Sequence, residues 1–375
     1  MIDQKQIREI VGAYNTRKIT IGVLGGHSAL DVCHGAKRHG FRTLVVCQKG
    51  REKTYQQYYA SAEGRGCVDK VIVLDRFADI VDEDVQRQLR DENTLFVHNR
   101  YFWVYCDFEK IENDFAVPII GTRSLLKCEE RTVPNNQYDL LKQAGIRIPQ
   151  IYADPCKIDR LVMVKVNEAI RGYERAFFLA GDHASYKKHI HDLLKRGVIT
   201  KETVKAAVIE EYVVGAQVNF NFFYSPLDGR LELMGTDMRR QTDLDGFLRL
   251  TAAEQLDLLK HRQPKMIETG HVAVTIKESL IEKVYALGEA FVQATRQALP
   301  PGIIGPFALQ GAVVAEHGKE DIVIFDVSLR IPGSPGTRST PYSGYLYDHS
   351  ISYGERIGME IKRAIAAKKL AALCT

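Results

Sequence analysis

Cysteine is sparse in this sequence and shows no pairing pattern. The 375 residues contain 7 cysteines, and none of them forms a C-x-x-C pair, so neither a zinc ribbon nor a disulfide framework is expected. No run of about 18 apolar residues occurs, so no membrane-spanning helix is expected. The first residues, MIDQKQIREIV, are charged and lack the apolar core of a signal peptide. These absences predict a cytoplasmic location and no membrane partner.

The sequence also lacks a large excess of charge of either sign. Lysine and arginine number 51 and the acidic residues 47, which gives a net charge of +4. No run of basic residues exceeds two or three, so a nucleic-acid partner is not expected. This mild basic excess suits small anionic ligands. At this length the chain is expected to form about two or three domains.

Strand-like and helix-like segments alternate over roughly the first 120 residues. The helical patterns HSALDVCHGAKRHG and DEDVQRQLRDE separate β-type runs, namely KITIGVLGG, FRTLVVCQ, DKVIVLD, TLFVHN and VPIIGT. This order predicts a parallel, doubly wound α/β sheet. After a linker near residues 154–160, long strands such as VNFNFFYSP and RLELMGTDM alternate with helices, which predicts an α+β arrangement.

The turn GGHSAL follows the first predicted strand and contains Gly25, Gly26, His27 and Ser28. It opens a helix, whose free N–H groups and positive dipole favour a phosphate. The pattern is not G-x-G-x-x-G, so the dinucleotide fingerprint is absent. The alternative is a tight turn in which Ser28 caps the helix.

Ionisable residues interrupt two apolar strands in the middle of the chain. Lys165 lies within LVMVKV, where its burial is costly unless an anion meets the ammonium group. The alternative is an edge lysine that reaches water. Glu210 and Glu211 in EEYVVG point to opposite faces if the segment is extended. One of them could accept a hydrogen bond from an amine while the Val213 backbone reads a purine edge; the alternative is a strand end with a surface carboxylate.

The segment FALQGAVVAEHGKEDIVIFDVSLRI predicts a β-hairpin centred near Gly318. Folding about that centre places Gln310 opposite Asp326, and period-two alternation puts Ser328 and Arg330 on the face of Asp326. These oxygen ligands suit Mg²⁺ together with substrate phosphates, and the arginine would neutralise a phosphoryl group in transfer. The alternative is a polar outer face on an exposed hairpin.

In this order the pieces resemble the ATP-grasp fold with an amino-terminal doubly wound (pre-ATP-grasp) domain. Within that superfamily the chain resembles the archaeal formate-dependent family that makes 5-formaminoimidazole-4-carboxamide ribonucleotide in purine synthesis. The resemblance covers nearly the whole chain and is carried by segments such as HSAL, RQLRDE, VPIIGTR, IEEYVVGA, FFYSPLDGRLELMGTDMRR and GPFALQ. It implies an amino-terminal domain over residues 1–122, connecting helices with a small ATP-grasp subdomain over 123–215, and a subdomain with the metal hairpin over 216–375.

The resemblance also implies a role for each candidate site residue. ATP would be bound by the strand lysine and the hinge, namely Lys165, Glu210, Glu211, Tyr212 and Val213. Mg²⁺ (or Mn²⁺) would be held by Gln310, Asp326 and Ser328. The catalytic residue beside the γ-phosphate would be Arg330. The ribonucleotide would be bound by His27, Ser28, Asn99, Asp237 and Arg239.

The implied reaction is ATP-dependent formylation of the ribonucleotide amine with formate, through formyl phosphate, in a protein that assembles with copies of itself. Four features depart from the family pattern. Residues 167–177 keep a single glycine, Asp326 replaces a glutamate, Arg100 replaces a small residue, and the loop RIPGSPGTRSTPYSG is shorter. They leave open a paralogue that ligates a different carboxylate and amine, or a nucleotide-binding homologue without catalysis.

Overall fold

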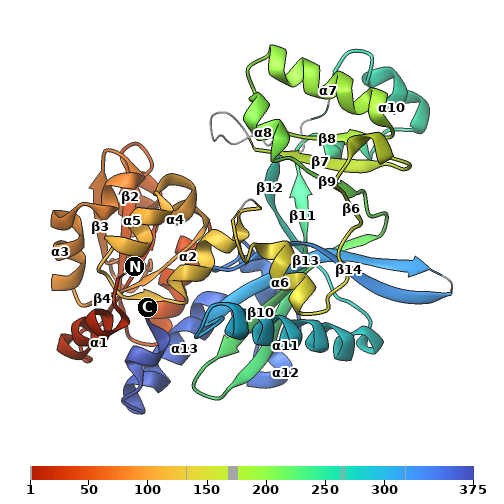
Figure 1. Cartoon of the computed structure of the whole chain (residues 1–375). Coiled ribbons are helices and arrows are strands. Elements are labelled where there is room, and N and C mark those ends of the chain that lie inside the picture. The colour runs from red at the N-terminus through yellow and green to blue at the C-terminus, as the bar shows by residue number, and fades with distance from the viewer. Residues whose placement is uncertain (1, 132, 168–175, 263, 265–266, 317) are drawn as a thin grey trace.

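The computed structural model describes residues 2–131, 133–167, 176–262, 264, 267–316 and 318–375. The described strands form three sheets, of five, five and four strands. Figure 1 shows the amino-terminal sheet with its helices at one side of the molecule, and the small four-stranded sheet standing above the large antiparallel sheet. None of the helices in the described residues has the length and apolar character that a membrane crossing requires.

The amino-terminal sheet has the order β3-β2-β1-β4-β5, and all its pairings are parallel. Its strands are β1 (Thr20–Leu24), β2 (Arg42–Gln48), β3 (Lys70–Leu74), β4 (Thr94–Val97) and β5 (Ile119–Ile120). Its helices are α1 (Gln4–Ala13), α2 (Ala29–Arg38), α3 (Glu83–Asp91), α4 (Arg100–Tyr105) and α5 (Phe108–Asn113). Strand β1 gives Ile21 and Val23 to one core and Leu24 to another, so both sheet faces are covered. The predicted doubly wound parallel sheet is confirmed.

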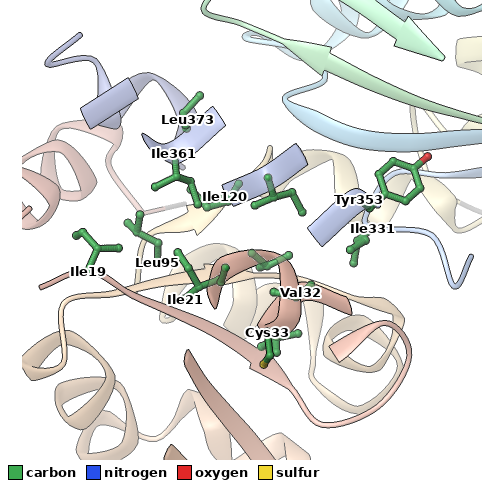
Figure 2. Close-up of a cluster of buried hydrophobic side chains, with 14 of the residues drawn as sticks. Ile19, Ile21, Val32, Cys33, Leu95, Ile120, Ile331, Tyr353, Ile361 and Leu373 are labelled. Atoms are coloured by element: carbon green, nitrogen blue, oxygen red, sulfur yellow. The ribbon is translucent and has the colours of Figure 1, made fainter. Parts of the chain in front are cut away.

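The carboxy-terminal segment returns to this first sheet. Helix α13 (Tyr353–Ala366) crosses α2 so closely that a Cβ on Gly35 would lie 1.9 Å from the carbonyl carbon of Gly354. The last residue, Thr375, exchanges two backbone hydrogen bonds of 3.0 Å with Ile119. Figure 2 shows side chains of this tail in one apolar cluster with side chains of the first sheet, among them Ile361, Leu373, Ile19, Ile21 and Leu95.

The small sheet has the order β6-β9-β7-β8 and is antiparallel throughout. Its strands are β6 (Ile151–Tyr152), β7 (Val162–Val166), β8 (Ala176–Ala180) and β9 (Val208–Glu211). Helices α7 (His183–Lys195) and α8 (Lys201–Lys205) belong to the same lobe (Figure 1). An apolar cluster that includes Val162, Val164 and Tyr186 fills the space between sheet and helices.

The large sheet has the order β12-β11-β10-β13-β14 and is antiparallel. Its strands are β10 (Ala216–Ser225), β11 (Arg230–Gln241), β12 (Glu268–Ala273), β13 (Gly305–Glu316) and β14 (Lys319–Ser328). Helices α6 (Gln137–Gln143) and α11 (Ile281–Ala298) pack on one face. Short helices α9 (Leu244–Phe247), α10 (Ala252–Leu258) and α12 (Gly344–Tyr347) lie in connections. The predicted α+β arrangement of this part of the chain is confirmed, whereas the domain boundaries at 122 and 215 stay a prediction.

The hairpin of β13 and β14 contains a bulge that sets its register. Near the turn Glu316 pairs with Lys319, but beyond Gly311 the register shifts by one residue and Gln310 lies opposite Asp326. The extra residue is Phe325, which pairs with no residue of β13. The predicted opposition of Gln310 and Asp326 is therefore confirmed.

Candidate active site

A polar pocket lies where the turn after β1 meets the large sheet and the loop that follows β14. Five residues that the sequence singled out line it: His27, Arg239, Gln310, Ser328 and Arg330. Arg100, one of the departures from the family pattern, lines the same pocket. These residues come from segments more than 300 positions apart, so the fold is what brings them together.

Lys165 is buried, with 8% of the residue exposed. Its Nζ lies 2.5 Å from a Glu210 carboxylate oxygen and donates to the Tyr138 hydroxyl (3.3 Å) and the Phe325 carbonyl (3.2 Å). Lys165 lies opposite Val208, and alternation puts Glu210 on the same sheet face. Burial lowers the pKa of Lys165, while Glu210 favours its charged form. The edge-lysine alternative is therefore wrong, because a buried anion meets the ammonium group.

The two adjacent glutamates point to opposite faces, as an extended segment requires. Glu210 is 3% exposed and accepts a hydrogen bond of 2.7 Å from Tyr138. Glu211 lies half-buried on the other face, 3.6 Å from Arg160, and accepts from the Gln150 backbone N–H (3.3 Å). The surface-carboxylate alternative fits Glu211 better than Glu210.

The hinge residues Tyr212 and Val213 lie between β9 and β10. The Tyr212 backbone N–H donates to the Leu161 carbonyl at 3.0 Å. In the part of the chain that the structure describes, the Val213 N–H has no hydrogen-bond partner. A backbone donor that the protein leaves open, at a half-buried position, is available to a ligand acceptor.

The polar end of the hairpin faces inward. Gln310 (6% exposed) donates to the Ser328 hydroxyl at 2.8 Å and accepts a hydrogen bond from Arg239. Asp326 lies 3.7 Å from Arg131 and 3.6 Å from Arg239. The exposed-hairpin alternative is wrong at this end, because Gln310 and Ser328 are buried in the pocket wall.

This end of the hairpin fits a divalent cation that also binds a substrate. No three His, Cys, Asp or Glu side chains among the described residues are grouped as metal ligands. Mg²⁺ commonly takes one or two carboxylates and completes its shell with phosphates and water. Asp326 and Gln310 offer one carboxylate and one amide oxygen. Arg131 and Arg239 now cover those oxygens and would have to turn toward the phosphates.

Arg330 keeps hydrogen-bonding capacity although it is buried. One of its terminal nitrogens lies 3.5 Å from Glu129, and its Nε has no hydrogen-bond partner among the described residues. Glu129 also accepts from the Leu329 backbone N–H at 2.7 Å. Burial raises the pKa of Glu129, and the charge of Arg330 opposes that rise. The guanidinium is thus oriented by one carboxylate and retains an N–H for a ligand oxygen.

The turn after β1 holds His27 and Ser28 at positive φ, 29° and 73°. The Ser28 hydroxyl donates to the Pro332 carbonyl at 2.8 Å and makes no capping bond to α2, so the alternative of a side-chain cap is wrong. The His27 ring lies against Gly333, where an added Cβ would be 2.2 Å from it. Burial lowers the pKa of His27 to about 3, with Arg330 adding to the effect. Its Nε2 is buried without a partner among the described residues, so a neutral ring is available to a ligand.

Asn99 supports this turn from the end of β4. Its Nδ2 donates to the carbonyls of Leu24 (2.9 Å) and Gly26 (3.2 Å), and its Oδ1 accepts from the Tyr101 N–H at the start of α4 (3.0 Å). The side chain is fully buried. The backbone therefore engages both its donor and its acceptor, and the predicted substrate contact by Asn99 stays a prediction.

Asp237 forms a buried charge cluster that the sequence revealed only in part. It accepts hydrogen bonds from Asn221 (3.0 Å), Ser334 (2.6 Å) and His271 Nδ1, and His271 Nε2 lies 3.0 Å from Glu268. Burial alone would lower the pKa of His271, but the hydrogen bonds to the two carboxylates raise it to about 9. The ring is therefore an imidazolium between two carboxylates at neutral pH.

Several residues of the site escaped sequence reasoning. His271 and Glu268 lie in the short strand β12, and ionisable residues among apolar ones are the feature of the sequence that could have indicated them. In the sheet, His271 lies opposite Arg239. Glu129 and Arg131 come from a segment whose helical pattern gives no sign of the pocket. The glycine-poor segment 167–177 was also singled out, and its residues 168–175 lie outside the described residues.

Known proteins share the architecture described above. A family described as a domain of unknown function (DUF1297) matches residues 185–375, and one described as a protein of unknown function (DUF1246) matches residues 21–152. The crystal structure of the IMP biosynthesis protein PurP from Thermococcus kodakaraensis is similar, with a TM-score of 0.67, 26% identity, and coverage of 95% of this chain and 100% of that chain. An ADP complex of PurK, the N5-carboxyaminoimidazole ribonucleotide synthetase, shares the fold at a TM-score of 0.58 and 12% identity, covering 89% of this chain and 78% of that chain. The predicted ATP-grasp fold is confirmed.

Curated relatives match the whole chain. The 5-formaminoimidazole-4-carboxamide-1-(beta)-D-ribofuranosyl 5'-monophosphate synthetase of Methanothermobacter thermautotrophicus is 37% identical, over 100% of this chain and 99% of the relative. The protein of the same name from Methanocaldococcus jannaschii is 38% identical, over 97% of both chains. The chain therefore belongs to the family of 5-formaminoimidazole-4-carboxamide ribonucleotide synthetases.

Proposed function

We propose that the protein is an ATP-dependent ligase that joins formate to the amine of 5-aminoimidazole-4-carboxamide ribonucleotide in purine biosynthesis. The observation that carries this proposal is identity of 37% with a synthetase of that name over the whole chain. The polar pocket supports it, because Arg100, Arg239 and Arg330 line a common space. The buried Arg330 Nε and His27 Nε2 there have no hydrogen-bond partner among the described residues, and preorganised groups of this kind suit a phosphorylated substrate.

ATP is proposed to lie between the small sheet and the hairpin. Its adenine would meet the open Val213 N–H beside Tyr212, and Glu211 is the glutamate with an unburied carboxylate near that hinge. Lys165 would contact the phosphates. Its present bonds to Glu210 and to the Phe325 carbonyl put it where the small sheet approaches the hairpin, which supports this role.

The ribonucleotide is proposed to bind over the turn after β1. The neutral His27 ring and the N–H groups at the start of α2 suit a 5′-phosphate. Asp237, Arg239 and the protonated His271 supply charged groups to the rest of the pocket. Asn99 holds the turn in place through its bonds to the carbonyls of Leu24 and Gly26, which supports its proposed place in this site.

The proposed chemistry has two steps. A formate oxygen takes the γ-phosphoryl group of ATP, which releases ADP and gives formyl phosphate. The amine nitrogen then attacks the formyl carbon, the bond to the phosphate oxygen breaks, and phosphate leaves while the nitrogen loses a proton. Arg330 would neutralise the phosphoryl group, aided by Arg131 and Arg239 once they turn from Asp326. A divalent ion, Mg²⁺ or Mn²⁺, held by Gln310, Asp326 and Ser328 would supply further positive charge when bound.

One observation favours a second candidate function. Arg100 lines the pocket where the family pattern expects a small residue, so a paralogue that ligates another carboxylate or amine is the alternative.

Assembly with copies of the same chain stays a prediction.

The test is ADP formation with ATP, Mg²⁺, formate and the ribonucleotide, with each omitted in turn. Turnover that needs all four is expected. Turnover that persists without formate or without the ribonucleotide, or that appears only with another acid, would favour the paralogue. Binding of ATP without any turnover would favour a homologue without catalysis.

A further inference from the structure

A second cavity lies at the amino ends of β1 and β2, whereas the candidate active site lies beyond the carboxyl end of β1. It has a volume of about 230 Å³ and is lined by the segment before β1, the turn between α2 and β2, and α13. The turn that carries His27 follows the carboxyl end of β1, whereas Ile19 precedes its amino end. Figure 2 shows Ile19 in one cluster with Ile361 of α13, which packs over this end of the strand. We call this cavity the basal pocket.

The rim of the basal pocket is strongly basic. Arg17, Lys18, Arg42 and Lys362 line it, and none of the acidic residues that the structure describes does. Arg42 pairs with Glu92 at 2.7 Å, while the side chains of Arg17, Lys18 and Lys362 have no ion-pair partner among the described residues. Gathered like charges repel one another, and a bound anion relieves that repulsion.

The inner wall of the pocket differs from the rim. Ile19 is 2% exposed, and Phe41 and Ile365 are half-buried, so apolar side chains lie below the cations. His39, at the end of α2, also lines the pocket; its Nε2 is buried and has no hydrogen-bond partner among the described residues. Burial lowers the pKa of His39, and the nearby Glu355 opposes that change; the unpartnered Nε2 is what the ring offers for a hydrogen bond. A free surface patch of lysines would have neither the apolar wall nor this buried nitrogen.

We propose that the basal pocket binds a ribose phosphate, either free or as part of a mononucleotide. The phosphate would lie against Arg17, Lys18 and Lys362, with the sugar or base over Ile19 and Phe41 and within reach of His39. The volume is below the roughly 300–1,000 Å³ of drug-sized sites, which limits the ligand to small metabolites. The occupant would contact the end of α2 and the face of α13, and α2 begins at the turn that carries Ser28.

The test compares three forms of the full-length protein by isothermal titration with ribose 5-phosphate, AMP and inorganic phosphate. The pocket variant is Arg17→Ala/Lys362→Ala. The control is Lys188→Ala/Lys201→Ala, which removes two exposed lysines from the small lobe. Both variants change exposed side chains, so both are expected to fold and to melt within a few degrees of the wild type. ADP formation by the pocket variant is expected to be unchanged.

The wild type and the control should each bind at least one equivalent of ribose 5-phosphate or AMP. The affinity of the pocket variant for the same ligand should be at least about tenfold weaker. The affinity of the wild type should fall as salt rises, because exposed charges are screened. Equal stoichiometry and affinity in all three forms would overturn the proposal. Inorganic phosphate binding as tightly as both ribosyl ligands would also overturn it, because the apolar wall would then contribute nothing. The outcome does not depend on the ligase activity, since the varied residues lie outside the candidate active site.

Discussion

Lys165 is saturated by protein partners in the structure, with a carboxylate, a hydroxyl and a carbonyl around its ammonium group. A buried ion pair of this kind adds little to the stability of the fold, because the cost of desolvating the two charges offsets much of their attraction. Its position beside the hinge and the hairpin fits the proposed role toward the phosphates of ATP, which stays a prediction. Removing the lysine would also strand the buried Glu210.

Lys165→Met combined with Glu210→Gln separates these two effects. The neutral pair avoids a stranded charge, so it is expected to fold with a free energy of unfolding near that of the wild type. Its affinity for ATP, measured by isothermal titration, should be at least about tenfold weaker, or roughly 1.4 kcal/mol. The single change Lys165→Ala should cost about 3–5 kcal/mol of stability in addition. Unchanged ATP affinity in the double variant would remove Lys165 from the nucleotide site.

His271 gives a pH prediction with a definite sign. Its folded pKa of about 9 exceeds the ordinary value of 6.5, so its stabilising contribution is complete below pH 6.5 and is lost as pH rises through about 9. The contribution is at most on the order of 3 kcal/mol. Urea unfolding at pH 6.5, 7.5 and 9 should therefore show a loss of stability in the wild type that His271→Gln lacks. Parallel pH curves for the two proteins would contradict a protonated ring between Asp237 and Glu268.

At the level of elements, the β13–β14 hairpin separates a functional end from a structural end. Asp326 lies 3.6 Å from Arg239, which lines the pocket, whereas Asp321 on the same strand pairs with Arg147 (2.9 Å) and Lys283 outside it. Asp326→Asn is expected to reduce metal-dependent ADP formation by about a hundredfold or more, because one carboxylate ligand is lost. Asp321→Asn is the matched control and should leave the rate within about twofold. Equal rates for both variants would discard the hairpin as the metal site.

The crossing of α2 and α13 depends on glycine. A Cβ on Gly35 would lie 1.9 Å and 2.1 Å from backbone atoms of Gly354 and Glu355, which cannot move aside as a side chain could. Gly35→Ala is expected to lower the free energy of unfolding by about 3 kcal/mol or more. Gly12→Ala in α1, with no atom within 4 Å of the new Cβ, should instead raise it by up to about 1 kcal/mol. Chemical denaturation of both variants checks the pair, and equal effects would contradict this packing.

The sequence predicted elements and local faces well, because alternation and glycine turns are local signals. The hairpin centre near Gly318 gave the right partner for Asp326 only because the bulge at Phe325 shifts the register by one residue. No local pattern in the chain indicates that α13 packs against the first sheet. His271 lines the pocket, Arg131 lies beside Asp326, and Glu129 lies beside Arg330. All three come from other segments, and long-range placement of this kind leaves no periodic trace in the chain.

At the scale of the whole molecule, the candidate site depends on contacts between its parts. Lys165 of the small sheet donates to Phe325 of the hairpin, and Ser28 in the turn after β1 donates to Pro332 after the hairpin. The candidate site thus combines side chains from the parts of the chain around all three sheets, and no single sheet supplies them all. This arrangement is consistent with a ligase that must bring a nucleotide, a small acid and a ribonucleotide together.

The most direct measurement uses formate labelled with ¹⁸O at both oxygens, together with ATP, Mg²⁺ and 5-aminoimidazole-4-carboxamide ribonucleotide. Mass spectrometry of the products should find the formylated ribonucleotide with one labelled oxygen and inorganic phosphate with the other, because formate attacks phosphorus before the amine displaces phosphate. Formation of that ribonucleotide with unlabelled phosphate would contradict the formyl phosphate route. Absence of the formylated product, with ATP still bound, would contradict the proposed ligase itself.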